Sequence, residues 1–136
     1  MEQQGEATQS HKPVDPNEDL YRGVTAHQIK FDEKLRRYRP SSAAFKDRRG
    51  ELSVDIASKT TAAESLSRLP KSIAISSFHA SVPIEWGYSV VAAPVFNAPG
   101  VMDNPAHAVI TNGKAMSSKH ARELAVNHCS WAIPPR

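Results

Sequence analysis

The basic residues of this chain gather in one segment, where their spacing could bind phosphate groups. Between Lys30 and Arg49 the chain has eight lysines and arginines against three carboxylates, whereas the formal net charge of all 136 residues is only +3. Tyr38 stands among these arginines, and an aromatic ring between guanidinium groups can stack on a nucleobase while the arginines hold phosphates. The segment therefore predicts a surface for nucleic acid or another polyanion, formed by Lys34, Arg36, Arg37, Tyr38, Arg39, Arg48 and Arg49. The alternative is a solvated, charged face without a ligand.

A second group of candidates consists of polar residues beside expected turns and strand ends. A rigid sheet can position such residues for chemistry while water and ligand still reach them. The group is Arg22, Ser41, Ser42, Asp55 and His107. We expect at least three of these five to line a common cleft, with Arg22 as the anion-holding group and His107 as the titrating group.

Two short stretches resemble the sites of enzyme families. His79-Ala80-Ser81 and His128-Cys129-Ser130 are similar to the paired His-x-Ser motifs of the 2H phosphoesterases, a likeness that implies acid and base roles for His79 and His128 and phosphate binding by the two serines. Leu20–Val24 resembles the first strand of ADP-ribosyltransferases, which implies that Arg22 holds the phosphate of NAD. The enzyme alternative is therefore a phosphodiester- or NAD-processing activity, or a toxin-like transferase, with candidate catalytic residues Arg22, Ser42, Asp55, His79 and His107.

Three further stretches look like parts of small uncharacterised bacterial single-domain proteins. They are Pro40–Asp47, Leu52–Asp55 and Asn104–Ala108, and the resemblance would cover most of residues 18–131. It implies a bacterial origin and brings no activity with it. A third class of function, a protein-interaction module, also stays open.

The remaining residue types favour neither a metal nor a cofactor. The single cysteine, Cys129, excludes an internal disulfide framework and a cysteine-based zinc cluster. His120 and Glu123 have a spacing that could chelate a metal from one helix face, but no third ligand stands near them. No glycine-rich phosphate loop is present either. We expect no resident metal and no cofactor.

The elements that must position these residues form one domain. Residues 1–17 lack apolar periodicity and contain Pro13 and Pro16, so they predict a flexible tail. Residues 18–136 predict a single α+β domain, with a small mixed sheet of about five short strands and two or three helices. Strands are expected at 19–24, 43–46, 51–56, 72–78, 88–95 and 106–111, and helices at about 25–37, 61–69 and 118–128, with a single helical turn after Ser81.

The chain shows no run of apolar residues long enough to span a bilayer and no secretory signal at its start. The expectation is a cytoplasmic protein without a membrane partner.

Overall fold

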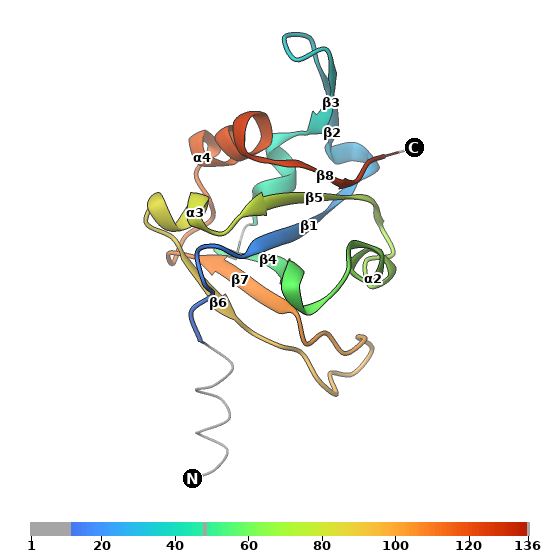
Figure 1. Ribbon diagram of the computed structural model, residues 1–136, viewed down its shortest axis with the longest axis vertical. Helices are drawn as coiled ribbons and strands as arrows, with labels where there is room; N and C mark the ends of the chain where they lie inside the picture. Colours follow the sequence, from blue (N-terminus) through green and yellow to red (C-terminus); the bar gives the residue numbers. More distant parts are fainter. Residues whose placement is uncertain (1–11, 48, 136) are drawn as a thin grey trace.

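The computed structural model describes residues 12–47 and 49–135. Its centre is a six-stranded antiparallel sheet in the order β6-β7-β4-β1-β5-β8 (Figure 1). The strands are β1 (Asp19–Thr25), β4 (Glu51–Ile56), β5 (Ser72–His79), β6 (Ser89–Ala92), β7 (His107–Thr111) and β8 (Ser130–Ile133). Three helices accompany them: α2 (Ala62–Ser67), α3 (Ser81–Glu85) and α4 (Ser118–Glu123). The expected α+β class is confirmed.

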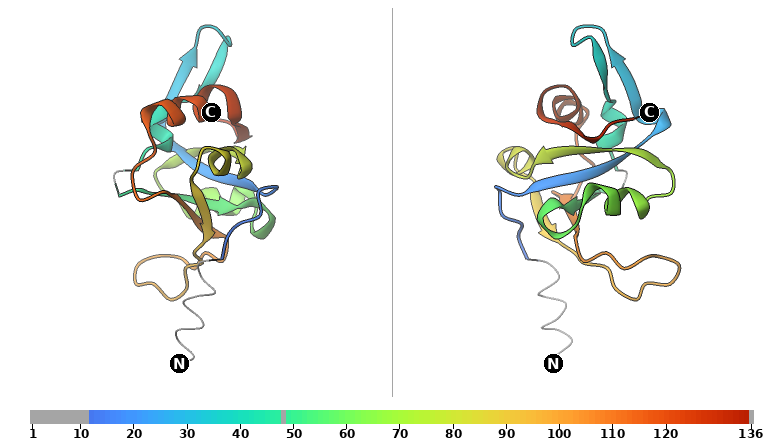
Figure 2. Two further views of the ribbon diagram at one scale, coloured as in Figure 1. Left: turned by 90° about the vertical axis from the view of Figure 1, so that its left-hand side faces the viewer. Right: turned by 45° about the vertical axis from the view of Figure 1, so that its right-hand side comes forward.

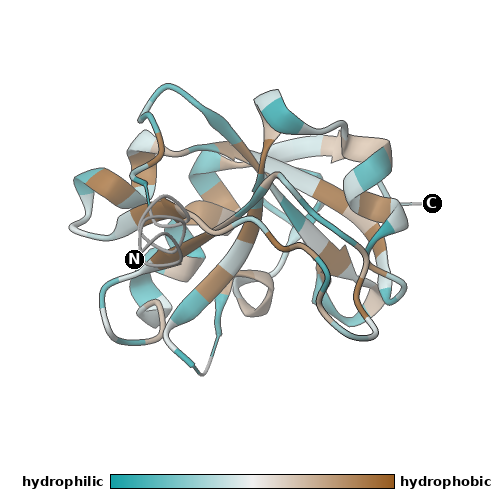
Figure 3. Ribbon diagram, turned by 90° about the horizontal axis from the view of Figure 1, so that it is seen from below, coloured by the Kyte–Doolittle hydropathy of each residue, from teal (hydrophilic) through white to brown (hydrophobic). Residues whose placement is uncertain are grey.

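The strands of the sheet follow the expected alternation of apolar and polar residues. In β4, the side chains of Leu52, Val54 and Ile56 are buried on one face, because successive residues of a strand point to opposite faces. Figure 3 shows the same alternation of apolar and polar segments along the ribbon. The apolar face of the sheet is covered by the 3₁₀ turn η2 (Ser42–Phe45), by α4 and by the wider turn η4 (Leu124–His128) that continues α4.

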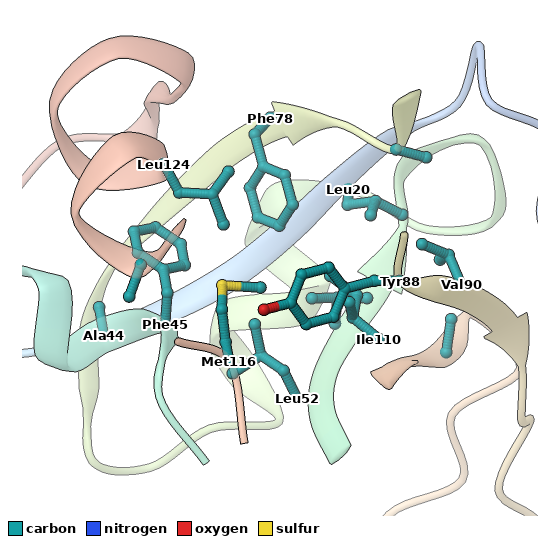
Figure 4. Close-up of a cluster of buried hydrophobic side chains, with 14 of the residues drawn as sticks. Leu20, Ala44, Phe45, Leu52, Phe78, Tyr88, Val90, Ile110, Met116 and Leu124 are labelled. Atoms are coloured by element: carbon teal, nitrogen blue, oxygen red, sulfur yellow. The ribbon is translucent and has the colours of Figure 1, made fainter. Parts of the chain in front are cut away.

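The core lies between this face and the covering elements. Phe45 of η2 packs edge-to-face on Phe78 of β5, and Leu124 is fully buried beside them (Figure 4). The sequence predicts an apolar stripe of Ala121, Leu124, Ala125 and Cys129 on the last helix; the first three are buried and Cys129 is half-buried. The helix α2 lies over the opposite, more polar face, since its buried Ser65 contacts Asp55 of β4.

A separate β-hairpin replaces the helix expected at about 25–37. Gln28 does accept a hydrogen bond from the Thr25 amide, as the capping pattern predicts, but the helix ends after the single turn η1 (Ala26–Gln28). The chain then forms β2 (Ile29–Asp32) and β3 (Arg37–Pro40), which pair with each other in a two-stranded sheet. Asp32 stabilises the turn between the two strands. Its side chain accepts a hydrogen bond from the Leu35 amide, and its backbone carbonyl accepts one from the Arg36 amide.

Two other elements differ from the expectation. Residues 43–46 do not form a strand: residues 43–45 belong to the turn η2, with Ala44 and Phe45 inserted into the core, and Lys46 follows the turn. The edge strand β8 was not expected from the sequence, and it pairs with β5.

The first described residues pack against the domain, so the tail does not extend to residue 17. The Val14 side chain is buried and its amide donates to the Val90 carbonyl at 2.8 Å, while the Ala92 amide donates to the Lys12 carbonyl. These bonds extend the sheet beyond β6. Residues 1–11 of the expected tail lie outside the described residues.

Candidate functional site

The β2–β3 hairpin stands out from the rest of the molecule in every view (Figures 1 and 2). Its register pairs Phe31 with Tyr38 and Ile29 with Pro40 on one face. The two aromatic rings form an edge-to-face pair with centroids 5.1 Å apart, and both stay in solvent, with Phe31 41% and Tyr38 59% exposed. Two exposed aromatic rings on a protruding hairpin form a small stacking surface.

The base of the hairpin is fixed to the domain. The Trp131 indole Nε1 of β8 donates to the Tyr38 carbonyl at 3.1 Å, and the Ser41 amide donates to the Gln28 carbonyl at 2.7 Å. Pro40 at the end of β3 is fully buried. The aromatic pair is therefore presented by an anchored element and not by a free loop.

Four of the basic residues of this segment are exposed on the hairpin, namely Lys30, Lys34, Arg36 and Arg37. Arg36 lies in the turn with a positive φ of 56°. Against these cations the hairpin exposes only the carboxylate of Glu33, because Asp32 is engaged by Arg39.

The remaining basic residues of the segment do not join this exposed set on the hairpin. Arg39 is only 7% exposed, and its Nε donates to Asp32 Oδ2 at 2.6 Å. Lys46 follows η2 and donates from Nζ to Ser118 Oγ at the start of α4, while Arg49 is exposed in the turn before β4. Arg48 lies outside the described residues. The cluster that looks continuous in the sequence is thus divided between a hairpin and a turn.

The second candidate site is a cavity of about 190 Å³ between α2 and the polar face of the sheet. Arg22, Asp55 and His107 all line it, so three of the five residues expected to share a cleft do so. Ser41 and Ser42 do not line it; Ser41 follows β3 and Ser42 begins η2.

Asp55 is the centre of a hydrogen-bond network in this cavity. Its side chain is buried and accepts from Ser65 Oγ at 2.6 Å, from Arg68 Nη2 at 3.2 Å and from Asn104 Nδ2 at 2.8 Å. Ser65 belongs to α2 and Asn104 to the long loop that joins β6 to β7. The carboxylate therefore holds a helix and a loop onto the sheet, and it is not a free catalytic base.

Arg22 fills the place where two strands separate. β1 pairs with β4 only at Leu20 and Tyr21, and the next residue, Arg22, donates from Nη1 to the Ser53 carbonyl and from Nε to the Ala44 carbonyl. Burial lowers the pKa of this guanidinium, and the negative charge of Asp47 partly offsets that effect.

His107 begins β7 at the edge of the same cavity. Its Nδ1 lies 2.8 Å from the Ala93 carbonyl. Because a carbonyl can only accept, Nδ1 carries the proton, and Nε2 is the ring atom left for a ligand.

Sequence reasoning missed the contribution of α2 to this cavity. Ser65 and Arg68 were ordinary polar residues of a short helix in the sequence, and Asn104 was one polar residue of a loop. The only signal was the capping pattern at Thr61 and Glu64, which does form and which fixes where α2 begins.

The two His-x-Ser stretches meet on the sheet, although not as the resemblance implies. His79 and His128 line one open groove, together with Ser77 and Ser130 of the paired strands β5 and β8. Ser81 does not line the groove and instead begins α3. Each histidine has a carboxylate near it: Asp19 Oδ1 is 3.4 Å from His79 Nε2, and Glu123 Oε1 is 4.0 Å from His128 Nε2.

Neither a metal cluster nor a membrane-crossing helix is found in the part of the chain that the structure describes. Within residues 12–47 and 49–135, no three His, Cys, Asp or Glu side chains come together as metal ligands. In the same ranges no helix has the length and apolar character needed to cross a bilayer. No protein-family model matches the sequence, and neither the curated proteins nor the solved structures give a significant match.

Proposed function

We propose that this protein binds single-stranded nucleic acid through the β2–β3 hairpin. The observation that carries the proposal is the exposed Phe31–Tyr38 pair on an element that also exposes four basic side chains. Bases stack on aromatic rings regardless of sequence, and lysines and arginines beside the rings hold the phosphates. A single strand is favoured over a duplex because its bases are free to stack.

The enzyme alternative has less support from the geometry. Asp55 accepts three hydrogen bonds from protein groups, and Arg22 donates two hydrogen bonds to backbone carbonyls. Both residues thereby stabilise the fold. The groove with His79 and His128 lacks a lysine or arginine among its lining residues that could hold a phosphate.

A protein partner is the second candidate, and it rests on a different loop. Phe96, Val101 and Met102 are exposed on the loop between β6 and β7, which protrudes at the opposite end of the molecule from the hairpin. Exposed apolar side chains that lie near one another are typical of protein-binding surfaces.

The test of nucleic-acid binding is a titration of a labelled, mixed-sequence single-stranded oligonucleotide, followed by fluorescence anisotropy at several salt concentrations. The variant K34A/R36A/R37A should weaken binding and reduce the salt dependence, which is about −0.7 in log–log slope for each phosphate contact on a single strand. The control K59A/K71A/R122A removes the same charge from exposed residues outside the hairpin and should bind nearly as the parent protein does.

The aromatic pair is tested separately with F31A and Y38A. Each should cost about 1–3 kcal/mol of binding free energy, the usual contribution of one stacked base. If the oligonucleotide does not bind at low salt, or if the control variant weakens binding as much as the hairpin variant, the proposal is wrong. If only the charge variant has an effect, the hairpin is a general polyanion surface without base stacking.

A further inference from the structure

The cavity beneath α2 contains more positive than negative charge. The charged side chains that line it are Arg22, Arg68 and Asp55, so two guanidinium groups face one carboxylate. That carboxylate is already engaged by Ser65, Arg68 and Asn104. A second anion would therefore balance the charge of the cavity.

Arg68 has a buried donor without an acceptor. Its Nη2 bonds to Asp55 at 3.2 Å and to Thr60 Oγ1 at 2.8 Å, but its Nε is buried and has no hydrogen-bond partner among the described residues. An unpaired buried donor is costly and rare in folded proteins. Arg68 lines the cavity, so a small turn of its guanidinium would bring the buried Nε to an oxygen atom of a ligand there.

Arg22 offers further donors from the opposite wall. Only its Nε and one Nη1 hydrogen are engaged, by the Ala44 and Ser53 carbonyls, so three N–H groups have no acceptor within the described residues. Thr25, Gln28 and Ser72 add neutral polar groups around the cavity. Donors thus come from β1, from the end of α2 and from the start of β5.

The size and donor arrangement indicate the class of ligand. A water molecule occupies about 30 Å³ in the liquid, so a cavity of about 190 Å³ has room for a phosphate group, and the rest of a larger ligand would extend through its open side. Donors on several sides suit a tetrahedral phosphate better than a planar carboxylate, which has only two oxygen atoms to share among them.

We propose that this cavity binds the phosphate group of a small phosphorylated ligand, with Arg68 Nε and Arg22 as the charged donors. The site is independent of the hairpin, and it needs no catalytic role for Asp55 or His107. Binding is coupled to folding, because the anion bridges the end of α2 to β1 and should stabilise the folded state.

The test is a titration of the full-length protein with inorganic phosphate, at constant ionic strength set with chloride, followed by thermal unfolding and by ³¹P line broadening. Phosphate should raise the melting temperature progressively, whereas chloride alone should not. Acetate should stabilise much less, because a carboxylate reaches fewer donors. An equal effect of acetate would overturn the assignment to phosphate.

Arg68→Lys keeps the charge and removes the Nε donor, so it should weaken phosphate binding by roughly ten- to a hundredfold. If that variant does not fold, Ser72→Ala tests the proposal instead, and we expect it to lower the affinity for phosphate by a smaller but measurable factor. The variant K34A/R36A/R37A should bind phosphate as the parent protein does, which separates this site from the hairpin. Unchanged phosphate affinity in both cavity variants would overturn the proposal, and so would a high-resolution structure at saturating phosphate with only water at Arg68 Nε.

Discussion

Asp32 and Arg39 form an ion pair across the β2–β3 hairpin, with Nε of the arginine 2.6 Å from Oδ2 of the carboxylate. The same carboxylate accepts from the Leu35 amide through its other oxygen, so one side chain orders both the turn and the strand pair. Arg39 also donates from Nη1 to the Pro40 carbonyl. This pair removes one arginine from the exposed basic set and uses it to hold the hairpin in shape.

The first prediction is that Asp32→Asn loosens the hairpin without unfolding the domain. The hydrogen bonds from Arg39 and Leu35 lower the pKa of Asp32 from its ordinary value of 3.8. Because the pKa is lower in the folded state, the stabilisation from the ionised Asp32 carboxylate is fully present above the ordinary pKa. It is lost as the pH falls through the folded-state pKa. Hydrogen exchange at neutral pH should be faster for hairpin amides in the variant. Exchange rates that do not change within 29–40 would contradict this role.

The second prediction concerns the network beneath α2. Asp55→Ala should lower the free energy of unfolding by about 3–5 kcal/mol, because it leaves the Arg68 guanidinium buried without its partner. Urea denaturation measures this loss. Asp103→Ala is the matched control: Asp103 is exposed and, among the described residues, its side chain accepts a hydrogen bond only from the Asn97 amide, so its removal should cost about 1 kcal/mol or less. Equal losses of unfolding free energy in the two variants would show that the Asp55 network adds little to stability.

The third prediction is that Gly23→Ala disturbs the packing of α2 against β1. A Cβ atom at this position would lie 2.5 Å from Leu69 Cδ1 and 2.6 Å from Ser72 Oγ, so both side chains must move. The expected cost is about 1–3 kcal/mol of stability. In the background of Leu69→Ala the same substitution should cost less, since one of the two close contacts is gone. A double-mutant cycle of unfolding free energies measures the difference.

The fourth prediction concerns the thiol of Cys129. Burial raises the pKa of Cys129 from 9.0 to about 11, while the charges of Arg39 and Arg37 act in the opposite direction. The native thiol should therefore react slowly with iodoacetamide near neutral pH and quickly after denaturation. Since the pKa is higher in the folded state, the stabilisation from the protonated Cys129 thiol is complete below about pH 9. It is lost as the pH rises to about 11. Cys129→Ala should abolish that alkaline loss of stability.

The fifth prediction tests where the folded domain begins. Val14 is 6% exposed, so Val14→Ala should cost on the order of 2 kcal/mol through the lost contacts and the cavity left behind. Val101→Ala, at a position 61% exposed, should change stability by less than about 0.5 kcal/mol. Equal melting temperatures for the two variants would show that the Val14 side chain contributes no stability.

The sequence by itself determined the elements whose signals are local. The alternation of Leu52, Val54 and Ile56 predicts β4, and the capping pattern at Thr61 and Glu64 predicts the start of α2. The apolar stripe from Ala121 to Ala125 predicts the buried face of the last helix. Each of these patterns reports which face of one element is buried, and that information is contained in a few neighbouring residues.

Tertiary structure decided the rest, because it depends on partners far apart in the chain. The segment after Thr25 has a helical start signal, yet Tyr38 and Phe31 pair as strands, with Trp131 of β8 holding the base of the hairpin. The convergence of Arg22, Asp55 and His107 was expected from their positions at strand ends and turns. The hydrogen bonds from Arg68 and Asn104 to the Asp55 carboxylate were not expected, since these contacts span 13 and 49 residues of sequence. A residue's type gives its chemistry, but only the packing of distant elements determines whether its polar atoms are used by the fold or left for a ligand.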